Sequence, residues 1–481
     1  MRIGIIGTGY VGLVTGACFA QAGHRVTCVD VDRSKIDLLN KGEVPIFEPG
    51  LSELITQGRR RRMLGFSSDA RAVAAGADAV FLAVGTPSRS MDGAADLTNL
   101  FSATSEIAPA LRDGSLVIVK STVPIGTGEQ VQRLIQHLRP DLDFDVASNP
   151  EFLRAGCAIE DFRMPDRVII GVDTERALEV LTSLYCEMGI EPARVIATQR
   201  RAAELIKYAA NGFLATKIAF INEIADLCEA VDARVGDVAL GMGLDGRIGG
   251  QFLNAGPGFG GSCFPKDARA LAMAGKEHGA PMRIIEAVLA SNDQRKRSIA
   301  DKIRQGVGGD LRGKIIALLG LTFKAGTDDM RDAPSIALAE ALVEGGATVH
   351  AYDPVGIERA RELLPDGVRY HRTALDAARG ASAAVIVTEW DEFRRIDLGR
   401  LKRKMAAPLL IDLRNMLSKE QLGRLGIKYI GIGNGASRPG DLERQVAIPN
   451  WSKPHIGGYG TSTKSPKRPG ISLDQKILAA E

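Results

Sequence analysis

Short apolar runs separated by amphipathic stretches organise the first third of the chain. Five such runs occupy residues 2–7, 25–30, 79–84, 116–120 and 145–151. Continuous apolar runs of this length are typical of strands that are buried on both faces of a parallel sheet. The segments between them are long enough for crossover helices, and residues 14–22 have helical spacing. The pattern therefore predicts an α/β fold that begins with a doubly wound, Rossmann-like domain.

The second half repeats this pattern after a different kind of segment. Residues 201–231 carry apolar side chains at spacings of three to five, around much of the circumference of one long helix. Such a helix is typically buried between domains or subunits. Apolar runs then return at 314–320, 347–353, 384–388 and 409–412. We therefore predict a second Rossmann-like domain, joined to the first by the long central helix and a helical region.

The expected domain boundaries follow from these changes of pattern. They are residues 1–200 for a nucleotide-binding domain, 201–305 for the helical region and 306–435 for the second Rossmann-like domain. Residues 436–481 are rich in Gly, Pro, Ser and Lys and lack periodicity, so we expect a disordered tail.

The amino-acid composition argues against several classes of protein. The 481 residues are 45% hydrophobic and 25% charged, as in an ordinary soluble protein. The net charge of +3, without a long basic stripe, argues against a nucleic-acid partner. No apolar run is long enough for a membrane span, and the N-terminus lacks the pattern of a signal peptide. The six cysteines form no CxxC pair, so we expect a cytoplasmic protein without a structural metal.

The first predicted strand runs directly into a glycine-rich turn, Gly7-Thr8-Gly9-Tyr10-Val11-Gly12. In such a unit Gly7 permits the tight turn, Gly9 lets a pyrophosphate approach, and Gly12 lets helix and strand pack closely. Asp30 ends the next strand, where a carboxylate accepts hydrogen bonds from ribose hydroxyls and repels a 2′-phosphate. The unit predicts an NAD site, with FAD as the alternative because flavoproteins use the same unit.

Polar residues follow the other predicted strands of this domain. Thr86, Ser121, Thr122 and Glu151 each lie where a strand ends, and open parallel sheets bind ligands at that edge. Each is also a common turn or cap residue. Their shared location favours a functional site.

One cysteine lies between a glycine-rich run and a predicted helix, in Gly256-Pro257-Gly258-Phe259-Gly260-Gly261-Ser262-Cys263-Phe264-Pro265-Lys266-Asp267. Pro265 suits the first position of a helix, so Cys263 is expected beside a helix N-terminus, whose dipole favours a thiolate. The glycines remove side chains where a ligand could approach the backbone. Cys263 is therefore a candidate nucleophile.

Two polar residues interrupt the apolar pattern of the central helix. Lys207 and Asn211 are four residues apart and share one face. A lysine within an apolar helix needs a partner unless its ammonium extends to solvent at the helix edge, and spacing alone favours the edge.

The second Rossmann-like domain lacks the glycine signature of the first. Its corresponding segment is Gly320-Leu321-Thr322-Phe323-Lys324-Ala325-Gly326-Thr327, although the next strand again ends in an aspartate, Asp353. A lysine in place of the glycine cradle indicates a different phosphate ligand. We therefore expect a cleft that holds a dinucleotide and a second nucleotide.

These motifs resemble the UDP-glucose 6-dehydrogenase family, within the UDP-glucose/GDP-mannose dehydrogenases, in order from residue 1 to about residue 435. The matching segments are GTGYVG (7–12), KSTVP (120–124), NPEFLR (149–154), PDR (165–167), ELIKY (204–208) with Asn211, FLNAG (252–256), GFGGSCFPKD (258–267) and GLTFKAGTDDMRDAPS (320–335). The resemblance implies that the 6-hydroxymethyl group of UDP-glucose is oxidised to a carboxylate in two NAD-dependent steps, giving UDP-glucuronate.

The resemblance also implies catalytic roles. Cys263 is expected to add to an aldehyde intermediate, giving a thiohemiacetal that becomes a thioester and is hydrolysed. Lys207 and Asn211 are expected to stabilise negative charge on the reacting oxygen, and Asp267 to act as a base through water. Glu151 and Thr122 would help to place water and cofactor. For Asp267 a purely structural role is also open, because a carboxylate in the first turn of a helix is favourable.

Ligand contacts are implied in the same way. The NAD contacts implied are Gly7, Gly9, Val11, Gly12, Asp30, Lys35, Thr86, Thr122, Lys266 and Arg331. The UDP-glucose contacts implied are Glu151, Phe152, Leu153, Lys207, Asn211, Arg247, Phe252, Leu253, Asn254, Ala255, Gly256, Gly260 and Lys324. Arg247 resembles an arginine that reaches the neighbouring subunit's site, which implies a homodimer. Ala155 departs from the usual Glu or Gln at this position, which implies an altered NAD contact.

Two other functions stay open. The same chemistry acts on GDP-mannose or UDP-N-acetylhexosamines in related enzymes, but the 252–256 loop and Arg247 favour UDP-glucose. A catalytically silent NAD-binding protein is the second alternative. The presence of Cys263, Lys207, Asn211 and Asp267 argues against it.

Overall fold

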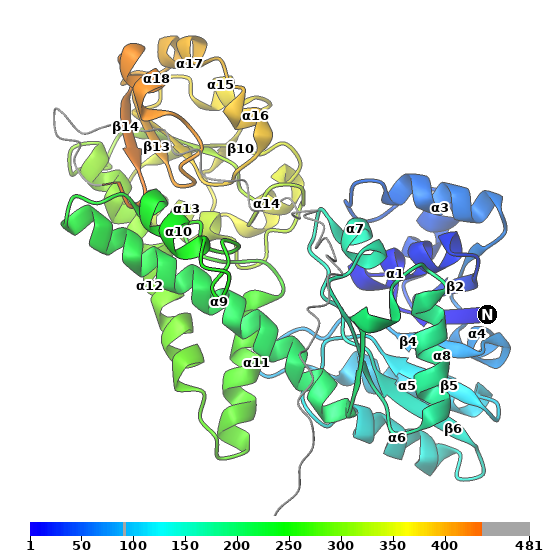
Figure 1. The fold of residues 1–481 in the computed structure, drawn as a ribbon. Coiled ribbons are helices and arrows are strands. Elements are labelled where there is room, and N and C mark those ends of the chain that lie inside the picture. The colour runs from blue at the N-terminus through cyan, green and yellow to red at the C-terminus, as the bar shows by residue number, and fades with distance from the viewer. Residues whose placement is uncertain (90–92, 435–481) are drawn as a thin grey trace, which may run out of the picture. The chain divides into compact units, whose positions relative to one another are not determined.

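The computed structural model describes residues 1–89 and 93–434, and the tail expected at 436–481 lies outside them. The first α/β half contains the strands β1 (Arg2–Ile6), β2 (Arg25–Val29), β3 (Leu64–Ser67), β4 (Ala79–Leu82), β5 (Ser115–Val119), β6 (Phe144–Ser148), β7 (Val168–Gly171) and β8 (Val195–Thr198). Its helices are α1 (Tyr10–Gln21), α2 (Arg33–Lys41), α3 (Leu51–Arg60), α4 (Ala70–Gly76), α5 (Thr98–Ile107), α6 (Thr127–Leu138), α7 (Ala158–Arg163) and α8 (Glu175–Cys186), with short 3₁₀ turns at Ala108–Ala110 and Pro192–Arg194 (Figure 1).

The strands of this half form one sheet in the order β3-β2-β1-β4-β5-β6-β7-β8. Neighbouring strands are parallel except for β6 and β7, which pair antiparallel. The chain starts at β1, winds outward to β3, and then returns to add β4 on the other side of β1. This reversal opens a crevice beyond the carboxyl ends of β1 and β4, where such folds bind nucleotides.

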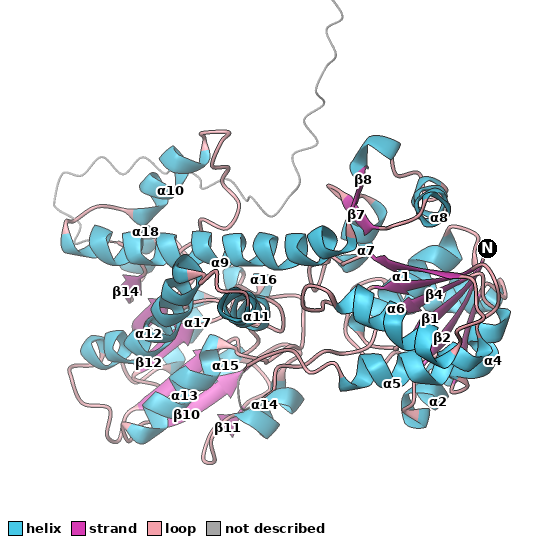
Figure 2. Cartoon of the chain, turned by 90° about the horizontal axis from the view of Figure 1, so that it is seen from below, coloured by secondary structure: helices cyan, strands magenta, loops and turns pink. Residues whose placement is uncertain are grey.

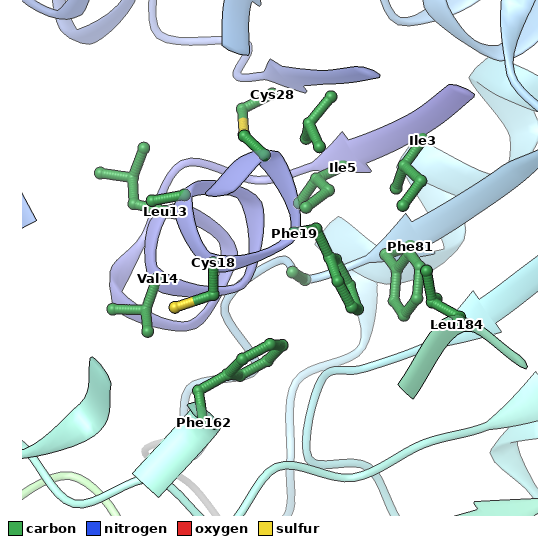
Figure 3. Close-up of a cluster of buried hydrophobic side chains, with 14 of the residues drawn as sticks. Ile3, Ile5, Leu13, Val14, Cys18, Phe19, Cys28, Phe81, Phe162 and Leu184 are labelled. Carbon is green, nitrogen blue, oxygen red and sulfur yellow. The ribbon is translucent and has the colours of Figure 1, made fainter. Parts of the chain in front are cut away.

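Helix α1 is buried over most of its length because it packs between the sheet and other helices. Its Phe19 is fully buried, with ring centroids of Phe81, Phe162 and Tyr185 within 5.3–5.9 Å (Figure 3). On the sheet side, a Cβ at Gly16 would lie 2.5 Å from the sulfur of Cys28. This close packing fixes the N-terminus of α1 at the end of β1.

The second α/β half has the strand order β11-β10-β9-β12-β13-β14, parallel throughout. Its strands are β9 (Ile315–Leu319), β10 (Thr348–Tyr352), β11 (Arg369–Tyr370), β12 (Ala383–Ile386), β13 (Leu409–Asp412) and β14 (Lys428–Gly431). Its helices are α13 (Pro334–Glu344), α14 (Ile357–Leu363), α15 (Ala374–Ala377), α16 (Asp391–Arg394), α17 (Leu398–Lys404) and α18 (Lys419–Arg424). The prediction of two Rossmann-like halves is confirmed.

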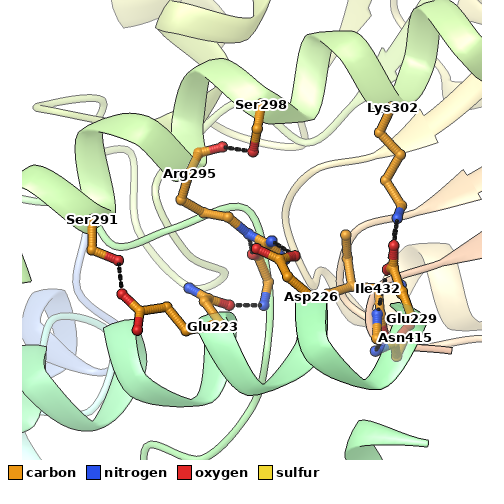
Figure 4. A network of polar contacts seen from close by, with 12 residues as sticks. Glu223, Asp226, Glu229, Ser291, Arg295, Ser298, Lys302, Asn415 and Ile432 are labelled. Atoms are coloured by element: carbon orange, nitrogen blue, oxygen red, sulfur yellow. Dashed lines mark hydrogen bonds and ion pairs between the residues drawn. The ribbon is translucent and has the colours of Figure 1, made fainter. Parts of the chain in front are cut away.

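Four helices connect the two halves along the chain: α9 (Arg200–Ala230), α10 (Val235–Gly243), α11 (Phe264–Glu277) and α12 (Arg283–Gly306). Helix α9 is a single element of 31 residues (Figure 2), within one residue of the predicted 201–231. Polar pairs join it to α12: Ser291 to Glu223, Arg295 to Asp226 and Lys302 to Glu229 (Figure 4). No helix in the described part of the chain is both long and apolar enough to cross a membrane.

One face of α9 differs from the expectation. The apolar pattern predicted burial around much of the helix, but Phe213, Phe220 and Leu227 are 65%, 47% and 56% exposed. These residues are seven apart and therefore lie along one stripe. The helix is buried on its other faces, which carry Lys207 and Asn211.

Candidate functional site

The glycine turn after β1 is built for a close approach of backbone segments. Gly7 has φ of 111°, and a Cβ there would lie 2.5 Å from the carbonyl oxygen of Ala83. A Cβ at Gly12 would lie 2.0 Å from the carbonyl oxygen of Gly7. At Gly9, the residue that precedes α1, a Cβ would meet no atom within 4 Å. The open space is therefore at the helix N-terminus, where backbone N–H groups attract a pyrophosphate.

Asp30 lies immediately after β2 and faces this turn. Its carboxylate accepts hydrogen bonds from the backbone N–H and the hydroxyl of Thr8, at 2.9 and 2.7 Å. Burial alone would raise the pKa of Asp30, but these hydrogen bonds with Thr8 and Asp32 hold it below the usual value. An ionised carboxylate at this position fits the ribose of NAD and repels a 2′-phosphate.

The other implied NAD contacts lie around the same sheet edge or in the second half. The Thr86 hydroxyl donates to the Thr122 carbonyl at 2.8 Å and so ties together the segments after β4 and β5. Val11 and Lys35 are half-buried, and the Lys35 ammonium lies 4.0 Å from Asp32. Arg331 binds Asp329 at 2.8 Å, and its carbonyl accepts from the N–H of Gly261.

Lys207 and Glu151 form a buried ion pair. Their side chains are 4% and 6% exposed, and Nζ lies 3.0 Å from Oε1. The other oxygen of Glu151 accepts from the backbone N–H of Leu153 at 2.5 Å. Burial opposes both charges, but the pair outweighs it: the pKa of Glu151 is lowered and that of Lys207 is raised. The lysine is therefore not at the exposed edge that spacing alone favoured.

Asn211 and Asp267 lie beside this pair. The Asn211 side-chain amide donates to Oδ2 of Asp267 at 2.7 Å, and the Lys266 ammonium lies 2.9 Å from Oδ1. Asp267 is 1% exposed. Lys266, which the resemblance implied as an NAD contact, is thus paired with a carboxylate of the cluster.

Cys263 precedes α11, but the helix begins one residue earlier than predicted. Phe264 is its first residue, which places Pro265 second and Asp267 fourth rather than third. The surroundings of the thiol oppose the thiolate that the helix N-terminus favours. Burial raises the pKa of Cys263, the carboxylates of Glu151 and Asp267 add to this, and the ammonium of Lys207 opposes it. Desolvation and nearby negative charges both favour the neutral thiol.

Two glycines before Cys263 pack closely against another loop. A Cβ at Gly260 would lie 2.3 Å from the Asp332 carbonyl oxygen, and one at Gly261 would lie 2.8 Å from the Phe323 ring. Both contacts are with the loop that follows β9 and precedes α13. A side chain at either position would therefore collide with protein atoms, and the approach of a ligand to this backbone stays a prediction.

The loop after β9 holds Lys324. The aspartate that echoes Asp30, Asp353, is 1% exposed and accepts from the N–H groups of Leu321 and Gly356 at 2.7 Å. Asp353 therefore holds this loop through its carboxylate, as Asp30 holds the turn at Thr8. Burial lowers the pKa of Lys324, whose ammonium lies 5.6 Å from the Phe323 ring. Within residues 1–89 and 93–434 it forms no ion pair, which suits a diphosphate ligand.

The implied sugar-nucleotide contacts form two groups. Phe152, next to Glu151, has the Arg167 guanidinium 3.7 Å and the Lys207 ammonium 5.3 Å from its ring centre. In the loop 252–256, Phe252 has φ of 64°, Leu253 and Ala255 are buried, and Asn254 is exposed. The Arg247 side chain is 90% exposed and binds its neighbour Asp245.

Several residues of this region carried no sequence signal. Asn292 of α12 accepts from the N–H of Phe259 at 2.8 Å and donates to its carbonyl at 3.1 Å, and Arg295 donates to the Gly256 carbonyl at 2.9 Å. Glu48 accepts from the N–H groups of Gly156 and Ala158. Each holds a loop that is distant in sequence, and neither spacing nor a local motif marks such a contact.

Comparison with known proteins identifies a family whose models match most of the chain. Three models of the UDP-glucose/GDP-mannose dehydrogenase family match consecutive parts: the NAD binding domain at residues 1–189, the central domain at 201–294 and the UDP binding domain at 317–419. The first of these identifies the cofactor as NAD, rather than the FAD that the glycine motif left open.

Individual relatives agree. A UDP-glucose 6-dehydrogenase of Rhizobium meliloti (strain 1021) is 53% identical over 435 residues, covering 90% of this chain and 99% of that protein. The structure of a UDP-glucose dehydrogenase from Pyrobaculum islandicum is similar with a TM-score of 0.83 and 38% identity, over 90% of this chain and 98% of that one. A UDP-D-ManNAc dehydrogenase from Pyrococcus horikoshii has a TM-score of 0.79 and 27% identity, over 90% and 99%. The chain belongs to the UDP-glucose/GDP-mannose dehydrogenase family.

Proposed function

We propose that this protein oxidises C6 of UDP-glucose from an alcohol to a carboxylate, giving UDP-glucuronate. The observation that supports it most is the buried Lys207–Glu151 pair, whose ammonium is close enough to Cys263 and Asp267 for both to contribute to the raised pKa of Lys207. NAD, when bound at the glycine turn, supplies the hydride acceptor for both oxidations. The resemblance to UDP-glucose dehydrogenases of known name supports the choice of sugar nucleotide.

In the first oxidation the alcohol must lose its proton while negative charge develops on oxygen. Lys207 and one N–H of Asn211 stabilise this charge, because both are donors held in a buried site where charges interact strongly. Asp267 accepts the alcohol proton through a water molecule. Its hydrogen bond with Asn211 fixes the carboxylate relative to the oxygen-binding donors.

In the second oxidation the aldehyde is held as a covalent adduct. The Cys263 sulfur forms a bond to the aldehyde carbon, and the thiol proton passes to a neighbouring carboxylate. The thiohemiacetal gives its hydride to the bound acceptor and its hydroxyl proton to a neighbouring base, and this leaves a thioester. Water then attacks the carbonyl carbon, the C–S bond breaks, and the thiol takes up a proton again. A cavity of about 10 Å³ between Thr122, Ser148 and Lys207 is large enough for one water molecule.

The binding roles follow the two α/β halves. We assign NAD to the domain at 1–200 with Gly7, Gly9, Gly12, Asp30 and the other implied contacts. We assign the uridine diphosphate to the domain at 306–435 with Lys324, and the sugar to Phe152, Leu153 and the loop 252–256. The helical region at 201–305 supplies Lys207, Asn211 and Cys263.

A homodimer is part of this proposal. The stripe of Phe213, Phe220 and Leu227 on α9 is large, apolar and exposed, which is typical of a surface that a partner covers. Arg247 is exposed, and only its neighbour Asp245 among the described residues pairs with it, so the side chain can extend toward a second subunit. Light scattering after gel filtration should show a dimer for the wild type and a monomer for Phe220→Asp. A Phe220→Asp protein that stays dimeric would rule out this face.

The decisive measurement is the number of NADH molecules formed per UDP-glucose consumed. Two are expected, and one would mean that the aldehyde is released. Cys263→Ser should abolish net acid formation, whereas Cys186→Ser, a half-buried cysteine of α8, should not. Normal turnover of Cys263→Ser would refute the covalent step.

A panel of nucleotide sugars tests the substrate. Preference for GDP-mannose or a UDP-N-acetylhexosamine would refute UDP-glucose as the substrate and favour the same chemistry on that sugar nucleotide. No NADH with any sugar would favour the catalytically silent alternative.

A further inference from the structure

A hollow at one edge of the second sheet plays no part in the proposed reaction. It has a volume of about 390 Å³ and is lined by His350 of β10, Tyr370 of β11, and His371, Arg372, Asp376 and Arg379 around α15. Cavities of a few hundred Å³ are typical of small-molecule sites. None of these residues takes part in the catalytic cluster or the loops described above.

Two histidines at this hollow have an unused ring nitrogen. The rings of His350 and His371 lie 4.6 Å apart, centre to centre. His350 is 7% exposed, and its Nδ1 lies 3.1 Å from the Ala377 carbonyl. A carbonyl only accepts, so Nδ1 carries the proton and Nε2 of the neutral ring is a bare acceptor. Among the described residues, Nε2 of each histidine is buried and without a partner, which is costly unless a ligand satisfies it.

The charged groups around the two rings are mainly positive. Arg372 and Arg379 line the hollow, and Arg369 of β11 lies near enough to disfavour protonation of both histidines. Within residues 1–89 and 93–434, the guanidinium groups of Arg369 and Arg372 form no ion pair. The negative group is Asp376, which is engaged by the Thr373 hydroxyl at 2.8 Å and by Arg379 at 3.3 Å.

The remaining groups at the hollow are already paired. The Tyr370 hydroxyl donates to the Ala360 carbonyl at 3.1 Å, and Arg361 of α14 stacks on the Tyr370 ring at 4.6 Å. The hollow therefore offers one guanidinium without an ion pair among the described residues, that of Arg372, and two imidazoles that gain positive charge on protonation. A metal ion fits poorly, because the described residues contain no cluster of three ligating side chains and the arginines repel a cation.

We propose that this hollow binds the phosphate group of a small phosphorylated metabolite, and that binding is coupled to proton uptake by the His350–His371 pair. Arg372, which lines the hollow, donates to the phosphate oxygens, for which a planar guanidinium is well suited. Protonation of the histidine pair adds positive charge beside the phosphate, and the anion in turn favours the imidazolium. The volume of about 390 Å³ exceeds that of phosphate alone, so the rest of the ligand also fits.

The test uses the full chain with histidine labelled at Cε1 and with UDP added in excess to occupy the separate nucleotide site. The chain has six histidines, so the NMR spectrum is simple. Adding inorganic phosphate at neutral pH should move the His350 and His371 signals toward the protonated position and leave that of the exposed His137 unchanged. His371→Asn assigns the pair. Calorimetry should show proton uptake and an affinity that falls by up to about tenfold per pH unit above the imidazole pKa.

Matched arginine variants separate this site from general charge effects. Arg372→Ala should weaken phosphate binding about threefold to tenfold, because one charge-assisted contact is lost. Arg312→Ala should change nothing, since Arg312 is 82% exposed and binds its neighbour Asp310. Both positions are at the surface, so neither substitution endangers folding.

A second probe, ribose 5-phosphate, distinguishes a phosphate ester from the free anion. Tighter binding than that of inorganic phosphate is expected. Three results would overturn the proposal: unshifted His350 and His371 signals, equal phosphate affinity of Arg372→Ala and Arg312→Ala, or a response of the two histidines to zinc ions but not to phosphate.

Discussion

Replacing Lys207 by Met tests how far the buried ion pair beside Cys263 depends on charge. Methionine has a similar length and shape but no charge. The Lys207 and Glu151 side chains are 4% and 6% exposed, so the change leaves a buried carboxylate without its cation. Breaking a buried pair in this way costs about 3–5 kcal/mol of the free energy of unfolding.

The pH dependence of the free energy of unfolding shows whether the loss of charge causes the destabilisation. In the wild type the pKa of Glu151 is lowered, so its contribution is complete above its unfolded pKa of about 4.3 and is lost as pH falls. The pKa of Lys207 is raised, so its contribution is complete below about 10.4 and is lost as pH rises. Between these limits the contribution of the pair is constant.

In Lys207→Met only the Leu153 N–H and Lys120 oppose the effect of burial on Glu151. We expect the pKa of Glu151 then to lie above its unfolded value. A group of this kind stabilises the fold at low pH and loses that contribution as pH rises through the raised pKa. The variant should therefore lose about 1.4 kcal/mol for each pH unit over which Glu151 is protonated only in the folded protein.

The assay is urea denaturation followed by circular dichroism at pH 5 and pH 8. Lys217→Met is the matched control, because Lys217 lies on the same helix and its ammonium donates to the carbonyls of Ile248 and Gly249 at 3.0 Å. The deficit of Lys207→Met should be larger at pH 8 than at pH 5, that of Lys217→Met should be equal at both, and adding Glu151→Gln should recover much of the loss. A Lys207→Met deficit that is independent of pH would refute the reasoning.

Three further predictions follow from single contacts. Gly9→Ala should keep the melting temperature but weaken NAD binding, because the added Cβ meets no protein atom. Gly12→Ala should unfold at a clearly lower temperature, because its Cβ would lie 2.0 Å from a carbonyl oxygen. Equal melting temperatures of the two variants would contradict this. Asn292→Leu should lower the free energy of unfolding by about 1–3 kcal/mol, because the buried N–H of Phe259 loses its acceptor. It should also raise the KM for UDP-glucose. Calorimetry measures the first effect and steady-state kinetics the second. Alkylation of Cys263 by iodoacetamide should be slow at pH 7 and accelerate about tenfold per pH unit, since burial raises its pKa, and a rate that is flat above pH 6 would contradict this.

The fold was predictable because its signals are local. Each strand is a short apolar run, and α9 matches the predicted 201–231 to one residue because its spacing is continuous. The likeness between the two halves is also local. Asp353 ends its strand as Asp30 does, and its carboxylate accepts from the N–H groups of Leu321 and Thr322 as that of Asp30 accepts from Thr8.

The charge state of Cys263 could not be predicted from its own segment. The helix dipole is encoded within four residues, but burial has the largest effect on the pKa of the thiol, and the next charges, Glu151 and Lys207, are more than fifty residues away in sequence. The use of Gly260 and Gly261 was hidden for the same reason, since the loop that fills their space lies at 323–333. Periodicity and motifs predict the local structure of a segment, but the pKa and the packing of its residues also depend on contacts with distant segments.

The raised pKa of Cys263 bears on how the proposed covalent step begins. Burial is the first cause, and the charges of Glu151 and Asp267 raise the pKa further. The same carboxylates are the groups that can accept the thiol proton when sulfur attacks the aldehyde. Lys207, bound to Glu151 and opposing the rise in pKa, then stabilises the oxygen that becomes negative in that attack. In the proposed mechanism the thiol keeps its proton until the step that uses the sulfur.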